Sequence, residues 1–207
     1  MDSYEWDIFI SYRRVDANWV NWTQIFQETL HSVVQPALQR PLRVFLDDTI
    51  EDGNSWPLTL ARALAGSRLL VPILSRNYFD SDWCKLELGL MMKRETSLNY
   101  RSPGRPEGLI IPLSIDDGDE FPEIVRPIKY RKFHDFGSPI LVRFSPLHER
   151  LGQELLKLKD PIANALGRAP VFQSVWEHET ADEFVRLFAL RAARPMASIP
   201  PMTGGLS

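Results

Sequence analysis

Residues 67–88 read SRLLVPILSRNYFDSDWCKLEL, and this stretch decides the fold class. The run from Arg68 to Leu74 is almost continuously apolar, which predicts a strand that is covered on both faces. Asp80 or Ser81 then caps a helix that extends to about Lys93. A strand covered on both faces and followed by a helix is typical of a parallel sheet.

The same alternation of short apolar runs and amphipathic segments extends in both directions. Four further runs predict strands, at residues 6–12, 42–46, 109–115 and 130–135. Three further segments carry apolar residues at helical spacing, at residues 16–36, 55–66 and 145–166, and Asp16 and Ser55 are the predicted N-caps of the first two. This order predicts an α/β fold of flavodoxin-like type: five parallel strands with helices on both faces of the sheet.

Composition and charge exclude several classes of protein. The 207 residues are 44% hydrophobic, which is enough to form a full core. The net charge is -3 and no cluster of Lys and Arg stands out, so direct binding to nucleic acid is not expected. One cysteine, Cys84, and four scattered histidines predict neither a disulfide nor a metal site, and they favour a reducing, cytoplasmic location. The apolar runs are much shorter than the roughly 18 residues of a membrane span, so no membrane partner is expected.

The composition changes near Gly167, which predicts a main domain over residues 2–166 and a C-terminal extension over residues 167–207. Thr180 to Arg194 predicts an amphipathic helix with acidic residues early and arginines late, as the helix dipole favours. Residues 196–207 have the composition of a linker or a flexible tail. The extension is therefore a candidate for assembly or for connection to a sensor.

Polar residues follow the predicted strands, at the edge where ligands bind in open α/β sheets. Ser11, Tyr12 and Arg13 follow the first strand, and Asp47 follows the second. The glycine-rich loops of dinucleotide-binding and P-loop enzymes do not occur in the sequence. A phosphoacceptor receiver domain needs an acidic pair after the first strand and an aspartate after the third, and this chain has neither.

Glu87 is the most informative single residue. It lies four residues after Trp83 and three before Leu90, so its carboxylate falls in an apolar stripe of the helix. Such a carboxylate either belongs to a reactive site or pairs with Arg13 or Arg14 and closes the helix onto the sheet. The pattern alone favours the second interpretation, because most paired or perturbed carboxylates are structural.

Four motifs, in their order and spacing, resemble those of Toll/interleukin-receptor (TIR) domains. They are WDIFISYRR at residues 6–14, RVFLDD at residues 43–48, the stretch 67–88, and FPEIVRPIKYRKFHDF at residues 121–136. The resemblance covers about Glu5 to Leu166 and includes the pattern WxxxE, formed by Trp83 and Glu87. It implies the five-stranded parallel sheet derived above, and it points to the prokaryotic, NAD-cleaving type of TIR domain.

The resemblance also implies a site. In the enzymatic branch the glutamate of WxxxE, here Glu87, is catalytic. The matching NAD-binding positions are Ser11, Tyr12, Arg13, Asp47, Trp56 and Trp83. The reaction would release nicotinamide and leave ADP-ribose or a cyclic isomer, with NAD as substrate and no cofactor. Cleavage builds positive charge on the ribose, which a fixed carboxylate stabilises, and the neutral leaving group needs no general acid.

Three functions stay open at this point. The resemblance implies an NAD nucleosidase that acts as a defence or signalling effector. Self-association through TIR domains would activate it, under the control of an upstream sensor or a fused module. A non-catalytic TIR interaction module is the alternative, although adaptor-type domains usually lack the glutamate at the position of Glu87. A nucleoside deoxyribosyltransferase-like enzyme would also set a glutamate against a sugar C1′, but it would act on free nucleosides.

Overall fold

The computed structural model describes residues 3–47, 56–106, 108–116, 121–125, 128–138 and 141–193. Within them, five strands form one sheet in the order β2-β1-β3-β4-β5, and all neighbouring strands are parallel. The strands are β1 (Trp6–Ser11), β2 (Val44–Phe45), β3 (Ser67–Leu74), β4 (Leu113–Ser114) and β5 (Arg131–Lys132). The predicted flavodoxin-like fold class is confirmed.

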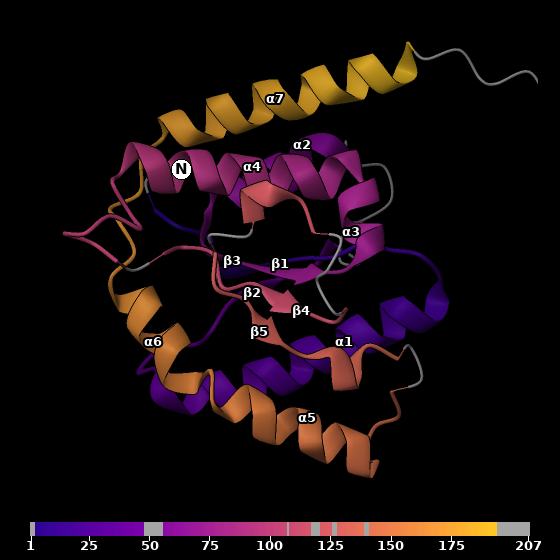
Figure 1. Cartoon of the computed structure of the whole chain (residues 1–207). Coiled ribbons are helices and arrows are strands. Elements are labelled where there is room, and N and C mark those ends of the chain that lie inside the picture. Colours follow the sequence, from indigo (N-terminus) through magenta and orange to yellow (C-terminus); the bar gives the residue numbers. More distant parts are fainter. Residues whose placement is uncertain are drawn as a thin grey trace, which may run out of the picture.

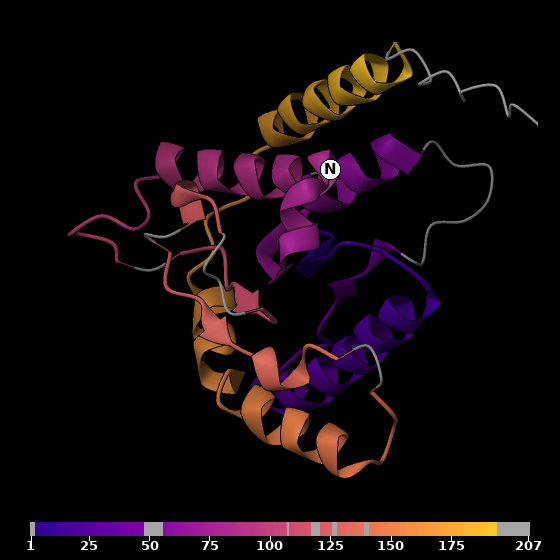
Figure 2. The same cartoon turned by 45° about the vertical axis from the view of Figure 1, so that its right-hand side comes forward.

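Helices cover both faces of the sheet, as Figure 1 shows. One face carries α1 (Ala17–Val34), α5 (Pro146–Leu156) and α6 (Lys159–Gly167). The other face carries α2 (Trp56–Ala65), α3 (Arg76–Asp80) and α4 (Asp82–Ser97). The last helix, α7 (Val175–Ala192), lies outside α2 and α4 and adds a further layer (Figures 1 and 2). No helix of the described residues is long and apolar enough to span a membrane.

The centre of the sheet is the pair β1 and β3, whose side chains are buried on both faces. Ile8 and Leu69 are fully buried and lie opposite each other in the register of the two strands. The last register pair joins Ser11 to Pro72, so the missing N–H of the proline falls at the end of the ladder. This pairing fixes Ser11 at the carboxyl edge of the sheet, where the site is expected.

Two helix caps that the sequence predicts are formed. Asp16 Oδ1 accepts the backbone N–H groups of Asn18 and Trp19 at the start of α1. Ser81 Oγ accepts the N–H of Cys84 and so caps α4. Asp80, the other candidate, instead ends α3, a short helix that the sequence analysis does not predict. The predicted cap of α2, at residue 55, lies outside the described residues.

The prediction of one helix over residues 145–166 is wrong, because the segment forms two helices, α5 and α6. Pro161 explains the break: its ring has no N–H and clashes with the carbonyl of Lys157 in a continuous helix. The apolar stripe is kept across the break, since Leu151, Leu158 and Ile162 are all buried. The interruption therefore changes the direction of the chain and not the face that it buries.

The start of the last helix and the lengths of the last two strands also differ from the predictions. Helix α7 begins at Val175 rather than Thr180, because Trp176 is buried there against Tyr4. The predicted fourth and fifth strands shrink to two residues each, and both side chains of β5 are exposed, as suits the edge of a sheet. Arg194, the predicted end of the last helix, and the predicted tail at 196–207 lie outside the described residues.

Candidate active site

Three buried polar side chains meet at the carboxyl edge of the sheet. Ser11 ends β1, Tyr78 belongs to α3, and Glu87 lies on α4. Ser11 Oγ is 2.5 Å from Glu87 Oε2 and 2.8 Å from Tyr78 Oη, and Tyr78 Oη donates to the carbonyl of Cys84 at 3.1 Å. We call this group the Ser11–Tyr78–Glu87 cluster.

The acid–base state of Glu87 follows from its burial. The side chain is 5% exposed, and burial raises its pKa from 4.5 to about 8. The hydrogen bond with Ser11 acts in the opposite direction and lowers the pKa, while the nearby charge of Asp47 raises it further. Near neutral pH the carboxyl group is therefore mostly protonated.

Tyr78 is a site residue that the sequence analysis missed. Burial raises the pKa of its phenol well above 10, so it remains a neutral hydroxyl that both donates and accepts. Its place could have been inferred from the cap that begins α3, because Ser75 Oγ accepts the N–H of Tyr78 directly after β3. That position lies on the same edge of the sheet as Ser11.

Cys84 contributes its packing and its backbone carbonyl to the site, and its thiol does not act as a nucleophile. Burial, followed by the negative charge of Glu87, raises the pKa of its thiol far above the usual range. The thiol donates weakly to the carbonyl of Tyr12, with Sγ and O 3.5 Å apart. A neutral buried thiol is a poor nucleophile, so the chemistry of this edge rests on Glu87.

Trp56 and Trp83, both predicted for the site, do come together. Their rings meet edge to face, with centroids 4.8 Å apart and an interplanar angle of 84°. Trp83 also contacts Phe184 of α7, with ring centroids 5.7 Å apart. Phe184 lies outside the stretch that carries the TIR resemblance, but its helical spacing from Trp176 could have marked it as an inward-facing residue. The three rings form an aromatic wall between α2, α4 and α7.

The predicted pairing of Glu87 with an arginine is not found among the described residues. Arg14 instead reaches Asp47, with Nη2 and Oδ1 3.4 Å apart, and its side chain is half exposed. Asp47 is near enough to Glu87 to act on its pKa. The acidic residue predicted after β2 thus lies beside the Ser11–Tyr78–Glu87 cluster, and Arg14 is its charged partner.

Tyr12 and Arg13 belong to a different part of the same edge. They line a cavity of about 60 Å³ on the side of α1, together with Trp19, Asn77 and Asp116 among others. Glu87 is not among the residues that line it. The structure therefore brings Ser11 to Glu87 and Trp56 to Trp83, and it places Tyr12 and Arg13 in the neighbouring cavity. In this conformation the Glu87 carboxyl group is closed to solvent.

The described residues contain no group of three or more His, Cys, Asp or Glu side chains that could hold a metal ion. The polar groups that the cluster offers are two hydroxyls and one carboxyl group, which suit hydrogen bonding to sugar hydroxyls and the stabilisation of a positive charge.

Comparison with curated proteins gives plant relatives. The disease resistance protein RPV1 of Vitis rotundifolia is 30% identical over 95 residues, which are 46% of this chain and 6% of that protein. The disease resistance protein TAO1 of Arabidopsis thaliana is 33% identical over 87 residues, which are 42% of this chain and 7% of that protein. The chain thus covers less than a tenth of the length of either relative.

A solved structure and a family model were also matched. The structure contains the TIR domains of the activated Roq1 resistosome directly recognizing the pathogen effector XopQ. It is 21% identical, with a TM-score of 0.41, and the match covers 89% of this chain and 99% of that one. The family model is described as a TIR domain and matches residues 8–140, the greater part of the chain, including β1 from Ile8 onward and Glu87. The chain belongs to the TIR domain family.

Proposed function

We propose that this chain is an NAD nucleosidase, which releases nicotinamide from NAD and leaves ADP-ribose or a cyclic isomer of it. The observation that carries the proposal is the position of Glu87. This glutamate of WxxxE is buried at the carboxyl edge of a parallel sheet and lies within hydrogen-bonding distance of Ser11. Ligands bind at that edge in open α/β folds, and a buried carboxyl group there is costly to keep without a role.

The chemistry needs a negative charge at the ribose. The bond between C1′ and the nicotinamide nitrogen breaks, and its electron pair leaves with nicotinamide, which becomes neutral. The positive charge that develops on the ribose is stabilised by the Glu87 carboxylate, whose field is strong because little water surrounds it. A water molecule, or a nitrogen of the adenine ring, then bonds to C1′; a water that attacks gives up a proton.

The other predicted residues have roles in binding NAD. Ser11 and Asp47 are placed to hydrogen-bond ribose hydroxyls beside Glu87. Trp83 and Trp56 exclude water on the side of α2 and α7, and Trp56 offers a face to a base. Arg13 is exposed at the rim, where a guanidinium group can bind a diphosphate with two parallel hydrogen bonds. Tyr12 lines the cavity between Arg13 and α1.

The closed state of Glu87 implies an activation step. The carboxyl group is buried, and it does not line the neighbouring cavity that Tyr12 and Arg13 line. Substrate therefore needs a rearrangement of this edge. We propose that self-association of TIR domains supplies it, under the control of an upstream sensor or a fused module.

The biological setting is part of the same proposal. Two curated relatives are named disease resistance proteins, which supports a role as a defence effector. A buried free thiol at Cys84 suits the reducing cytoplasm. The relatives named above come from plants, and the assignment to the prokaryotic type of TIR enzyme stays a prediction.

The test is an assay of nicotinamide release from NAD at high protein concentration, with and without a crowding agent. We expect release by the wild type, loss in Glu87→Ala, and no loss in Glu149→Gln, which removes a charge from α5 across the sheet. Chromatography of the products separates ADP-ribose from cyclic isomers. Cleavage of free deoxynucleosides in place of NAD would assign the chain to the deoxyribosyltransferase-like class.

A non-catalytic interaction module is the second candidate, and one observation favours it. Glu87 is buried and has its hydrogen-bonding partner inside the fold, as a purely structural carboxyl group would. In that case the chain assembles, but the wild type and Glu87→Ala release nicotinamide equally slowly under assembling conditions.

A further inference from the structure

The Ser11–Tyr78–Glu87 cluster makes three contacts between oxygen atoms, two among its own side chains and one with the carbonyl of Cys84, and each contact needs a proton. Tyr78 donates its proton to the carbonyl of Cys84, which can only accept. The contact between Tyr78 Oη and Ser11 Oγ then uses the proton of Ser11. The remaining contact, between Ser11 Oγ and Glu87 Oε2, has a proton only when the carboxyl group supplies it. A neutral Glu87 therefore satisfies all three contacts.

Ionisation of Glu87 reverses the direction of donation. Ser11 must then donate to the carboxylate, so the contact between Ser11 and Tyr78 has a proton only if Tyr78 supplies it. The phenol has only one proton, so Tyr78 can donate either to Ser11 or to the carbonyl of Cys84, but not to both. Tyr78 thus makes two hydrogen bonds when Glu87 is neutral and one when Glu87 is ionised.

We propose that Tyr78 is a positioning residue for the NAD-cleaving reaction, and that through Ser11 it holds the Glu87 carboxyl group in the neutral form while the site is closed. The inference rests on the proposed function, since a neutral carboxyl group cannot stabilise a positive charge on the ribose. Tyr78 then sets the acidity at which the reactive carboxylate forms.

The other charged and titratable groups near Glu87 do not replace this control. Asp47, after β2, carries a negative charge that also opposes ionisation. Arg14 is 3.4 Å from Asp47 and so acts mainly on that carboxylate. Cys84 lies on the same helix, and burial raises the pKa of its thiol far above neutrality. The charge of Arg13 lowers the pKa of this thiol in part. None of these groups is a hydroxyl, so none can relay a hydrogen bond to Ser11 as Tyr78 does.

Two conservative substitutions should move the pKa of Glu87 in opposite directions. Tyr78→Phe removes two hydrogen bonds from the neutral state and one from the ionised state, so the pKa should fall by about 0.5 to 1 unit. Ser11→Ala removes the hydroxyl that donates to the carboxylate, and a buried charge without a donor is the more costly loss, so the pKa should rise. A general loosening of the fold would not produce opposite signs.

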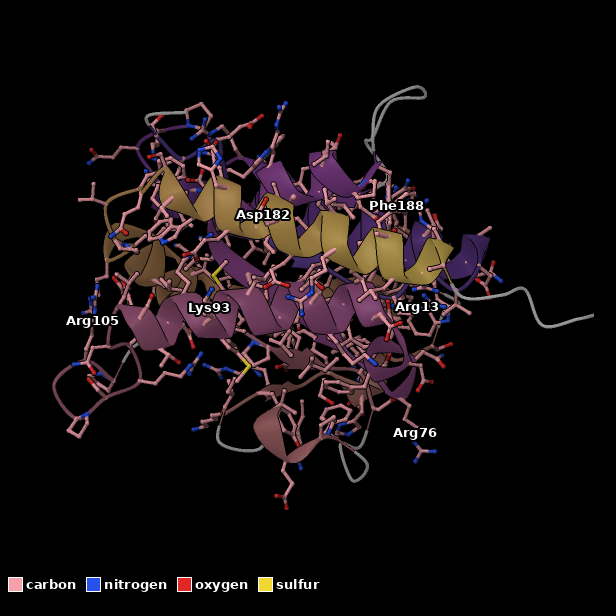
Figure 3. All side chains as sticks on the ribbon, turned by 90° about the horizontal axis from the view of Figure 1, so that it is seen from above. Arg13, Arg76, Lys93, Arg105, Asp182 and Phe188 are labelled. Carbon is pink, nitrogen blue, oxygen red and sulfur yellow. The ribbon has the colours of Figure 1, made fainter. Side chains whose placement is uncertain are left out.

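The measurement follows the infrared absorption band of the protonated carboxyl group as the pH is changed. The band is assigned to Glu87 if it is absent in Glu87→Gln. The measurement needs no NAD, so it remains informative whether or not the chain is an enzyme. The matched control is Tyr100→Phe, which removes a buried, hydrogen-bonded tyrosine hydroxyl beyond the far end of α4, close to Arg105 (Figure 3). It should leave the Glu87 band unmoved. Cooperative thermal unfolding checks that each variant folds.

The outcomes separate the two proposals. A downward shift in Tyr78→Phe, with the same downward shift in the pH profile of nicotinamide release, supports both. A downward infrared shift in a protein that never releases nicotinamide keeps the hydrogen-bonding role of Tyr78 and overturns the enzyme. An unmoved or raised pKa in Tyr78→Phe overturns the role of Tyr78, whatever the activity shows.

Discussion

Two buried carboxyl groups of this chain have opposite acid–base states, and their neighbours explain why. Burial opposes the ionisation of Asp7, but both of its oxygens accept from Arg40 at 2.6 Å, and its pKa is lowered overall. Glu87 is also buried, and burial raises its pKa to about 8, because its hydrogen-bonding partner Ser11 is an uncharged hydroxyl that offsets burial only in part. A carboxyl group with a shifted pKa at a ligand-binding edge is a candidate for function, whereas one fixed by arginine is structural.

The raised pKa of Glu87 gives a pH dependence of activity. The ionised carboxylate is the form that stabilises the developing charge on the ribose, so nicotinamide release at NAD concentrations well below KM, where the rate reports the pKa of the free protein, should rise as the pH increases through about 8. Initial rates between pH 6 and 9.5 check this expectation in fully folded protein. A rate that is flat, or that falls over this interval, would show that an ionised Glu87 does not limit the reaction.

The same shift gives a pH dependence of stability. The pKa of Glu87 is about 8 in the folded chain, against an ordinary value of 4.5. The neutral carboxyl group therefore contributes fully to stability below pH 4.5, and this contribution is lost as the pH rises through about 8. Glu87→Gln cannot ionise, and its free energy of unfolding should fall less than that of the wild type between pH 6 and 9. Urea unfolding at several pH values measures both. Parallel curves for the two proteins would contradict the raised pKa.

At the scale of elements, α7 supports the helix that carries Glu87. Phe184 of α7 is fully buried and contacts Trp83 of α4, one helical turn before Glu87. At the other end of α4, the guanidinium of Arg94 lies over the Trp176 ring at 4.3 Å and donates to the carbonyls of Ser67 and Ala65. Helix α7 is therefore in contact with α4 near both of its ends, in the arrangement that Figure 3 shows from above.

Truncation of Phe184 should weaken both the fold and the site. We expect Phe184→Ala to lower the free energy of unfolding by about 3 to 5 kcal/mol, as for other large core side chains. Phe188→Ala is the matched control on the same helix, because Phe188 is 54% exposed (Figure 3), and it should change stability by less than about 0.5 kcal/mol. Equal effects of the two substitutions would mean that α7 does not pack as described.

The elements that the sequence predicts well are those whose signals are local. The continuous apolar run of β3 and the caps at Asp16 and Ser81 need no knowledge of distant residues. Pro161 is a local signal for the break between α5 and α6, but the regular apolar stripe by itself predicts one continuous helix. The contact of Tyr78 with Ser11 joins residues far apart in the chain, so it depends on how α3 meets the sheet and could not be predicted from spacing.

At the scale of the whole molecule, the closed edge of the sheet predicts a dependence on assembly. Glu87 is buried in the single chain, so substrate reaches it only after a rearrangement that we assign to contact between TIR domains. Nicotinamide release per molecule should therefore increase with protein concentration and with crowding. Rates at several protein concentrations, compared with mass measurements at the same concentrations, test this. A rate per molecule that is constant from monomer to assembled protein would contradict it.

The central claim is that Glu87 stabilises the charge that develops on NAD during cleavage. The most direct test is nicotinamide release by the wild type and by Glu87→Gln at pH 9 under assembling conditions, with thermal unfolding to confirm that both proteins are folded. Loss of one preorganised charge at a reacting centre costs about 100-fold or more in rate, so the variant should retain about 1% of the wild-type activity or less. Equal release by the two proteins, or no release by either, would contradict the account.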